Sequence, residues 1–80
     1  MINNDLSQAV LLINTELGCE KDCIESLKDV TEIKEAYEVH GHYDIIMMLE
    51  AQNMQELKNL IRGRIKSNRF IRFSLTMIRA

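Results

Sequence analysis

The 80-residue sequence contains no proline and no tryptophan, and it has only two cysteines, two tyrosines and two phenylalanines. Cys19 and Cys23 lie too close in sequence to cross-link distant parts of a fold, so no disulfide framework is expected. No run of about 18 apolar residues is present, which excludes a membrane-spanning helix. Residues 1–5 lack the basic start and apolar core of a secretory signal peptide. Together these absences favour a reduced, cytoplasmic setting and no membrane partner.

The composition is that of one small folded domain over residues 1–80. Apolar residues make up 46% of the chain, which favours a globule over a disordered segment. A chain of this length buries only about 60% of the surface that it exposes when unfolded, so its stability is marginal unless a further contact enlarges the core.

Charge is distributed unevenly along the chain. Residues 1–56 contain all twelve acidic residues and three lysines, a balance of −9, whereas residues 57–80 contain seven basic residues and no acidic one, a balance of +7. Such a split can mark a nucleic-acid surface, or it can reflect pairing within the fold or between copies of the chain. The net charge of −2 favours pairing, because an acidic protein attracts phosphate poorly.

The hydrophobic pattern predicts strands over residues 9–13, 33–40, 44–50 and 71–78 and helices over residues 19–29 and from residue 53. Residues 9–13 and 45–49 are continuous apolar runs, whereas strands 33–40 and 71–78 alternate, which places Ile71 and Phe73 on one face. Helical apolar stripes run through Cys23 and Leu27 and through Leu57 and Ile61. Asn53 and Glu56 form a capping-box pattern at the start of the second helix.

The order of these elements is βαββαβ, which is typical of the ferredoxin-like α+β fold. In that fold a four-stranded antiparallel sheet has the order 4-1-3-2 and carries two helices on one face. Strands 1 and 3 must then be central, and they are the two that are apolar throughout. The other face of the sheet would expose Val10, Leu12 and either Ile46 or Met48, an apolar patch unusual for a monomer. We therefore expect a homodimer that packs through this face.

A glycine-centred turn between the second and third predicted strands contains several residues whose side chains could bind a ligand. His40, Gly41, His42, Tyr43 and Asp44 follow one another there, directly before the apolar strand. Glycine permits the positive φ that a tight turn requires. We expect the binding site of the protein to lie at this hairpin tip.

Residues 36–45, AYEVHGHYDI, are similar to the Val-x-Gly-x-Tyr-Asp hairpin of the Lrp/AsnC (feast/famine) transcription regulators, where it lies in the ligand-binding RAM domain. Leu17-Gly18 before the first helix, the helix from Asn53, and Ser74 and Thr76 in the last strand fit as well. The likeness covers about residues 7–79 and leaves no room for the helix-turn-helix domain of these regulators. The chain therefore resembles a stand-alone RAM domain with no DNA-binding domain.

The resemblance implies a function in transcription regulation through an effector, without enzymatic activity and without direct binding to nucleic acid. It implies homodimers, often assembled as an octamer (a tetramer of dimers), and an amino acid bound between dimers near the hairpin. Association with Lrp/AsnC regulators would be the route by which the chain modulates them. No other cofactor is required by this interpretation.

The ligand-binding residues that the resemblance implies are Gly41, His42, Tyr43, Asp44, Ser74 and Thr76. Gly41 would shape the turn and offer backbone N–H groups to a carboxylate. Tyr43 would wall the pocket, and Asp44 would accept from an α-ammonium group or fix the loop. The hydroxyls of the last strand would bond polar ends of the ligand, and His42 would tune specificity. His40 departs from the small polar residue usual in the family, which leaves the effector's identity open.

The alternative interpretation is a transition-metal site. Two imidazoles, His40 and His42, flank Gly41 and could ligate one copper, nickel or zinc ion, with copies around a symmetry axis completing the shell. Cys19 and Cys23 have chelating spacing, but Cys23 lies on the apolar helical stripe and is more simply a core residue.

The sequence lacks the features expected of two further functions, RNA binding and enzymatic catalysis. An RNA-recognition motif shares the βαββαβ order but stacks bases on aromatic residues of strands 1 and 3, and neither strand has one here. The chain also has no Ser-x-x-Lys motif, no glycine-rich phosphate loop and no Cys-His pair with a third partner. These observations argue against RNA binding and against an enzyme.

Overall fold

The computed structural model describes residues 6–79. The prediction that residues 1–5 do not begin a signal peptide concerns a segment outside the described residues. Its elements are β1 (Ser7–Thr15), α1 (Glu20–Ser26), β2 (Ile33–Glu38), β3 (Ile45–Ala51), α2 (Met54–Leu60), the π-helical turn η1 (Ile61–Ile65) and β4 (Ile71–Arg79). No helix within residues 6–79 is long and apolar enough to cross a membrane.

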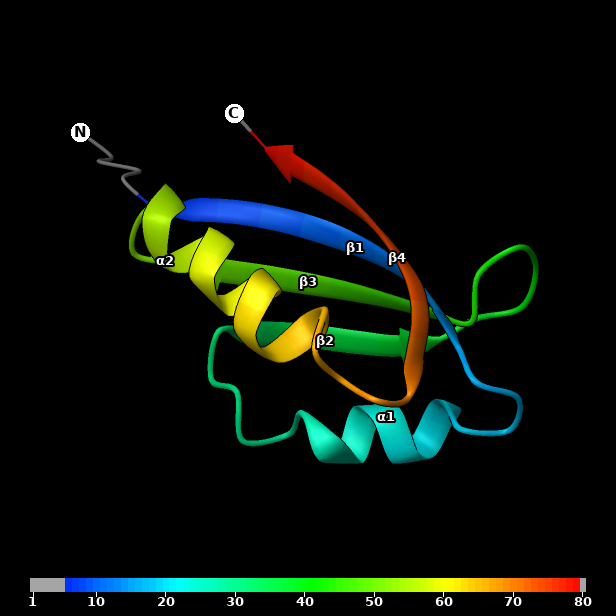
Figure 1. Cartoon of the computed structure of the whole chain (residues 1–80). Coiled ribbons are helices and arrows are strands. Elements are labelled where there is room, and N and C mark those ends of the chain that lie inside the picture. Colours follow the sequence, from blue (N-terminus) through cyan, green and yellow to red (C-terminus); the bar gives the residue numbers. More distant parts are fainter. Residues whose placement is uncertain (1–5, 80) are drawn as a thin grey trace.

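The four strands form one antiparallel sheet in the order β2-β3-β1-β4, which confirms the predicted ferredoxin-like topology. The two central strands are the two continuous apolar runs. Central strands that are apolar at every position are typical of a sheet with both faces covered, and here the helices cover one of the two faces. Both helices lie on the same side of the sheet, and the start of β1 and the end of β4 lie together at the end opposite the β2–β3 loop (Figure 1).

The core lies between the helices and one face of the sheet. Alternate residues of β1 and β3 point into it, because side chains alternate along a strand. Leu11, Ile13 and Ile45 are fully buried there, and Cys23 of α1 and Leu27 directly after it belong to the same core. The second helical region adds Leu57, Ile61 and Ile65. Both predicted helical stripes are therefore confirmed.

The helix ends differ from the sequence-based bounds in ways that local hydrogen bonds explain. Asn53 caps α2 as predicted, since its Oδ1 accepts from the Glu56 N–H at 2.8 Å. The first helix ends at Ser26 instead of residue 29. There the Ser26 hydroxyl donates to the Cys23 carbonyl at 2.7 Å, and the Leu27 N–H donates to Ile24, three residues back. Such tightened bonding is how helices commonly terminate.

Two features of the strands were not predicted. The second strand stops at Glu38, and one further bond in the same register, from the Val39 N–H to the Asp44 carbonyl at 2.9 Å, closes a loop over residues 39–44. The last strand contains a bulge, where the register shifts between Asn14 and Thr15 of β1. Ile71 therefore packs against the core and does not share a face with Phe73 as the alternation indicated.

The face of the sheet away from the helices is apolar, and we call it the open face. Cross-strand pairs place Val10, Leu12, Tyr37, Ile46, Met48, Phe73, Leu75 and Met77 on it. Five of these are large side chains that are between 38% and 52% exposed. The patch thus spans all four strands, as the sequence predicted for the two central ones.

Two glycines give a test of the backbone. Gly63 lies in η1 with open space at its Cβ position, whereas Gly41 has a φ of +135°. We expect Gly63→Ala to raise the free energy of unfolding by about 0.5–1 kcal/mol, because alanine restricts the unfolded chain. Gly41→Ala should lower it by about 1–3 kcal/mol through backbone strain. Urea denaturation at one protein concentration measures both changes. Destabilisation by Gly63→Ala would contradict the placement of Gly63 in a helical turn with open space at its Cβ position.

Candidate functional site

The loop over residues 39–44 carries most of the residues that the sequence singled out. His40, Gly41 and His42 are exposed at its tip, whereas Tyr43 and Asp44 are half-buried at its base. Gly41 has the positive φ expected of a turn glycine. The loop lies at the same end of the molecule as the connection from β1 to α1 (Figure 1).

Asp44 ties this loop to the end of β1. Its Oδ2 accepts a hydrogen bond from the Thr15 N–H at 2.9 Å, and its own N–H donates to the Ile13 carbonyl at 2.9 Å. A carboxylate that accepts from a backbone N–H makes a stronger bond than a neutral acceptor. Asp44 therefore holds the base of the hairpin on the central strand of the sheet.

A hollow of about 370 Å³ opens beside this contact, and we call it the hairpin pocket. Its lining includes Asn14, Thr15, Leu17, Glu20, Asp44 and Arg72. Arg72 supplies a positive charge, and Asp44 and Glu20 supply negative charges. Leu17 is 98% exposed at the rim, so an apolar surface is available there as well. The hydroxyl of Thr15 is buried in the wall and has no hydrogen-bond partner within residues 6–79.

Sequence reasoning missed every lining residue of the hairpin pocket except Asp44, including three that carry a hydroxyl group or a charge. Thr15 ends the first strand, Glu20 opens α1, and Arg72 is the extra residue of the β4 bulge. The bulge brings Arg72 to this end of the sheet, and nothing in the alternating pattern of residues 71–78 marks it. Only Asp44 of the pocket was expected.

Ser74 and Thr76 lie elsewhere, on the helix-side face of β4 opposite Ile13 and Leu11. They line a second hollow of about 330 Å³, which we call the basic hollow. Its lining includes Lys58, Ile61, Arg62, Lys66, Ser74 and Thr76. Within a single chain, Ser74 and Thr76 are therefore apart from the hairpin residues with which the sequence analysis placed them in one ligand site. Their joint role in one ligand site stays a prediction that needs a neighbouring copy.

The residues considered for metal binding are dispersed. His40 and His42 are exposed, and within residues 6–79 no three His, Cys, Asp or Glu side chains gather closely enough to hold an ion. Cys19 and Cys23 are free thiols, and burial, with a smaller effect of Cys19, raises the pKa of Cys23 to about 11. Cys23 is a core residue, as its position on the helical stripe indicated. A metal bound by the histidines of several copies stays a prediction.

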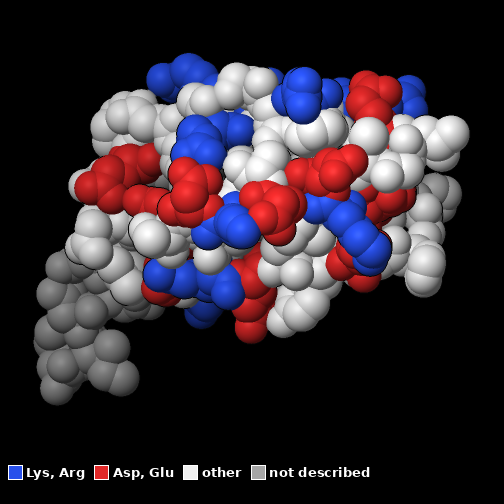
Figure 2. All heavy atoms as spheres, turned by 90° about the horizontal axis from the view of Figure 1, so that it is seen from below, with Lys and Arg blue, Asp and Glu red and all other residues white. Residues whose placement is uncertain are grey.

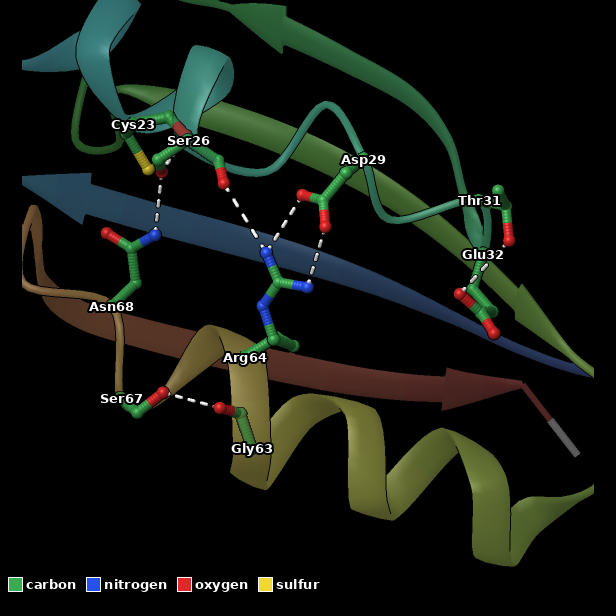
Figure 3. A network of polar contacts seen from close by, with 9 residues as sticks. All are labelled: Cys23, Ser26, Asp29, Thr31, Glu32, Gly63, Arg64, Ser67 and Asn68. Carbon is green, nitrogen blue, oxygen red and sulfur yellow. Dashed lines mark hydrogen bonds and ion pairs between the residues drawn. The ribbon is translucent and has the colours of Figure 1, made fainter.

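Ion pairs account for only part of the charge split along the sequence. Among residues 6–79 the pairs within 4.0 Å are Lys21–Glu38, Lys28–Glu25 and Arg64–Asp29. Only the last joins the acidic and basic segments. Arg64 donates from both terminal nitrogens to Asp29, at 2.9 and 3.1 Å, and ties η1 to the end of α1 (Figure 3). On the face seen in Figure 2, acidic and basic side chains alternate without a large patch of one sign.

Comparisons with known proteins agree with this architecture. The family model described as the Lrp/AsnC ligand binding domain matches residues 8–79. The crystal structure of FFRP-DM1 is 34% identical with a TM-score of 0.89, and the match covers 92% of this chain and 99% of that one. Hypothetical protein PHS023 from Pyrococcus horikoshii is also 34% identical, with a TM-score of 0.88 over 92% and 89% of the two chains.

A more distant match is a longer protein. Transcriptional regulator NMB0573 from Neisseria meningitidis, solved as a complex with L-Met, shares 12% identity and a TM-score of 0.82. The match covers 92% of this chain and 49% of the regulator, and at this identity it shows a common fold alone. No curated protein sequence matches the chain.

The two thiols should differ in reactivity. At pH 8 iodoacetamide should modify Cys19 in the folded protein and Cys23 only after unfolding, because Cys23 is fully buried and its pKa is raised to about 11. Mass spectrometry of peptides distinguishes the two sites, and a Cys19→Ser control should take up no label when folded.

The same shift predicts a pH dependence of stability. Between about pH 9 and 11 the unfolded chain loses the Cys23 proton while the folded chain keeps it, so the free energy of unfolding should fall as pH rises.

In the alkylation experiment, rapid modification of Cys23 in the folded protein would contradict its place in the core.

Proposed function

The chain belongs to the Lrp/AsnC ligand-binding domain family, and from this premise we propose that it is an oligomeric effector-binding module that binds an amino acid at the hairpin pocket. Binding would change its assembly, alone or with Lrp/AsnC regulators, and so modulate transcription. The family is one of regulatory ligand-binding domains and not of enzymes.

The observation that carries the amino-acid proposal is the presence of both charge signs in the hairpin pocket. An α-amino acid has an ammonium group and a carboxylate a few ångströms apart. Arg72 suits the carboxylate, and Asp44 with Glu20 suits the ammonium group. The Asp44 bond to Thr15 uses Oδ2, which leaves Oδ1 to accept from the ligand. The L-Met complex of the Neisseria regulator supports a ligand of this class.

The residues of the loop tip have supporting roles in this proposal. Gly41 gives the loop its shape and His42 stands at its exposed tip. Tyr43, half-buried beside Asp44, would flank the ligand. Ser74 and Thr76 would contribute to the same site only from a neighbouring copy, as a ligand held between dimers requires.

The open face supports association of two copies. It exposes large apolar side chains across all four strands, more than a soluble monomer ordinarily leaves in contact with water. Two such faces packed against each other would form a sheet-on-sheet core, which an 80-residue chain lacks on its own. We propose a homodimer through this face, with an octamer as the larger assembly.

Regulation follows from linkage between binding and assembly. A ligand shifts an equilibrium between assemblies only by the difference in its affinity for them. Phe73 lines the hairpin pocket and also lies on the open face, where its side chain is 52% exposed. A ligand that contacts Phe73 would therefore alter the rim of the dimer interface directly.

Two positions of nearly equal exposure on β4 test the dimer. Leu75 on the open face is 41% exposed, and Ile78 on the helix-side face is 42% exposed. Leu75→Glu should give a monomer, because it places a charge in the apolar interface, whereas Ile78→Glu should keep the wild-type mass. Analytical ultracentrifugation measures both, and an unaltered oligomer for Leu75→Glu would overturn the interface.

Calorimetric titration with the twenty amino acids tests the site. Asp44→Asn keeps an acceptor for the Thr15 N–H but removes the charge, so it should weaken amino-acid binding about ten- to a hundredfold without unfolding the protein. Arg72→Gln should weaken it similarly by removing the partner of the carboxylate. The control is Lys21→Gln, an exposed residue of α1 that does not line the pocket. Unchanged affinity in both pocket variants would remove the assignment.

A further inference from the structure

Three basic side chains converge on the basic hollow. Lys58, Arg62 and Lys66 recur at intervals of four residues along α2 and η1 and line the hollow together with Ser74 and Thr76 of β4. No residue of the hairpin pocket lines it. The cations and both hydroxyls come from one chain, so the arrangement does not depend on a neighbouring copy.

Within the described part of the chain, these three cations have no acidic partner. The ion pairs found within residues 6–79 involve Lys21, Lys28 and Arg64 and none of the three. The one side-chain polar contact of this set among residues 6–79 is a long bond from Arg62 to the Asn59 amide oxygen, at 3.4 Å. Like charges four residues apart on a helix repel each other, so their convergence is unfavourable until an anion neutralises them.

The helix geometry holds the three side chains on one stripe. The Lys66 N–H bonds to the Ile61 carbonyl at 2.8 Å, five residues back, which widens the turn into a π-helix. Four residues exceed one turn of an α-helix but fall short of one π turn. The step from Lys58 to Arg62 therefore rotates slightly past a full turn about the helix axis, and the step from Arg62 to Lys66 falls slightly short of one. The two rotations offset each other, so Lys66 lies on nearly the same side of the helix as Lys58.

A hydroxyl in the same hollow is unsatisfied. The Oγ1 of Thr76 is buried and has no hydrogen-bond partner within residues 6–79. Buried polar atoms are nearly always paired, so an orphaned hydroxyl indicates a partner that the chain itself does not provide. Basic residues near a helix C-terminus also complement the helix dipole, but the dipole accounts neither for the shared hollow nor for this hydroxyl.

We propose that the basic hollow binds a small multivalent anion, a metabolite that carries phosphate groups or several carboxylates. Lys58, Arg62 and Lys66 would neutralise it, and the hydroxyls of Ser74 and Thr76 would donate to its oxygens. The volume of about 330 Å³ suits a metabolite rather than a macromolecule. This site goes beyond the proposed amino-acid site and would give the module a second input.

Isothermal titration with sodium pyrophosphate and with sodium citrate, at constant ionic strength, tests the proposal on the intact chain. We expect saturable binding of at least one probe, with one site per chain. Preference for pyrophosphate assigns a phosphate ligand and preference for citrate assigns a carboxylate ligand. The double variant Lys58→Gln/Lys66→Gln should weaken binding at least tenfold.

The matched control is Lys21→Gln/Lys34→Gln, which removes the same number of charges from α1 and β2 and should leave binding unchanged. Thr76→Val should weaken binding several-fold, yet the free protein should unfold at the same or a higher urea concentration, because an unpaired buried hydroxyl is removed.

Three results would overturn the proposal. One is the absence of saturable binding of either probe at millimolar concentration, and another is an equal loss in the two double variants, which would indicate net charge alone. The third is binding of a DNA duplex that depends on Lys58 and Lys66 while neither small anion binds.

Discussion

Two central strands that are apolar on both faces are the constraint from which the rest of this molecule follows. The helices cover one face of β1 and β3, and burial there is nearly complete, with Leu11, Ile13 and Ile45 fully excluded from water. The same strands present Val10, Leu12, Ile46 and Met48 to the other side, where nothing within residues 6–79 covers them. Because hydrophobic burial is the main favourable contribution to folding, a small chain with half of its sheet uncovered gains stability by association. In the proposed homodimer, assembly would complete the cover of the sheet.

That constraint also joins the candidate binding site to the assembly surface. Asp44 bonds to backbone groups of Thr15 and Ile13, so the hairpin is anchored on the strand that carries both the core and the open face. Phe73 lines the pocket and lies on that face. A ligand at the pocket would therefore act on the interface through one strand and one shared side chain, over a short path. Such a path requires no large conformational change, because a shift in the rim of an interface alters the association equilibrium directly.

The pattern of apolar residues was sufficient to predict the topology, since each strand has a distinct periodicity and only one sheet order places the two continuous runs in the centre. The pattern did not predict the bulge opposite Thr15. The apolar and polar residues of β4 continue to alternate through it, so the register shift cannot be read from the sequence. That one irregularity reverses Ile71 toward the core and brings Arg72 to the hairpin end. The sequence thus indicated Asp44 but not its neighbours Thr15, Glu20 and Arg72, which come together only in three dimensions.

The uneven charge of the sequence has a structural meaning that composition alone could not supply. If its purpose were pairing within the chain, bridges between the acidic and basic segments would be numerous, yet within residues 6–79 only Arg64–Asp29 joins them. Four of the other six basic residues of this basic segment lie at two places. Lys58, Arg62 and Lys66 face the basic hollow, and Arg72 faces acidic residues across the hairpin pocket. Exposed ion pairs contribute little to stability in any case, so pairing within the chain explains the segregation poorly. The two proposed sites, one suited to a zwitterion and the other to an anion, would account for four of these basic residues.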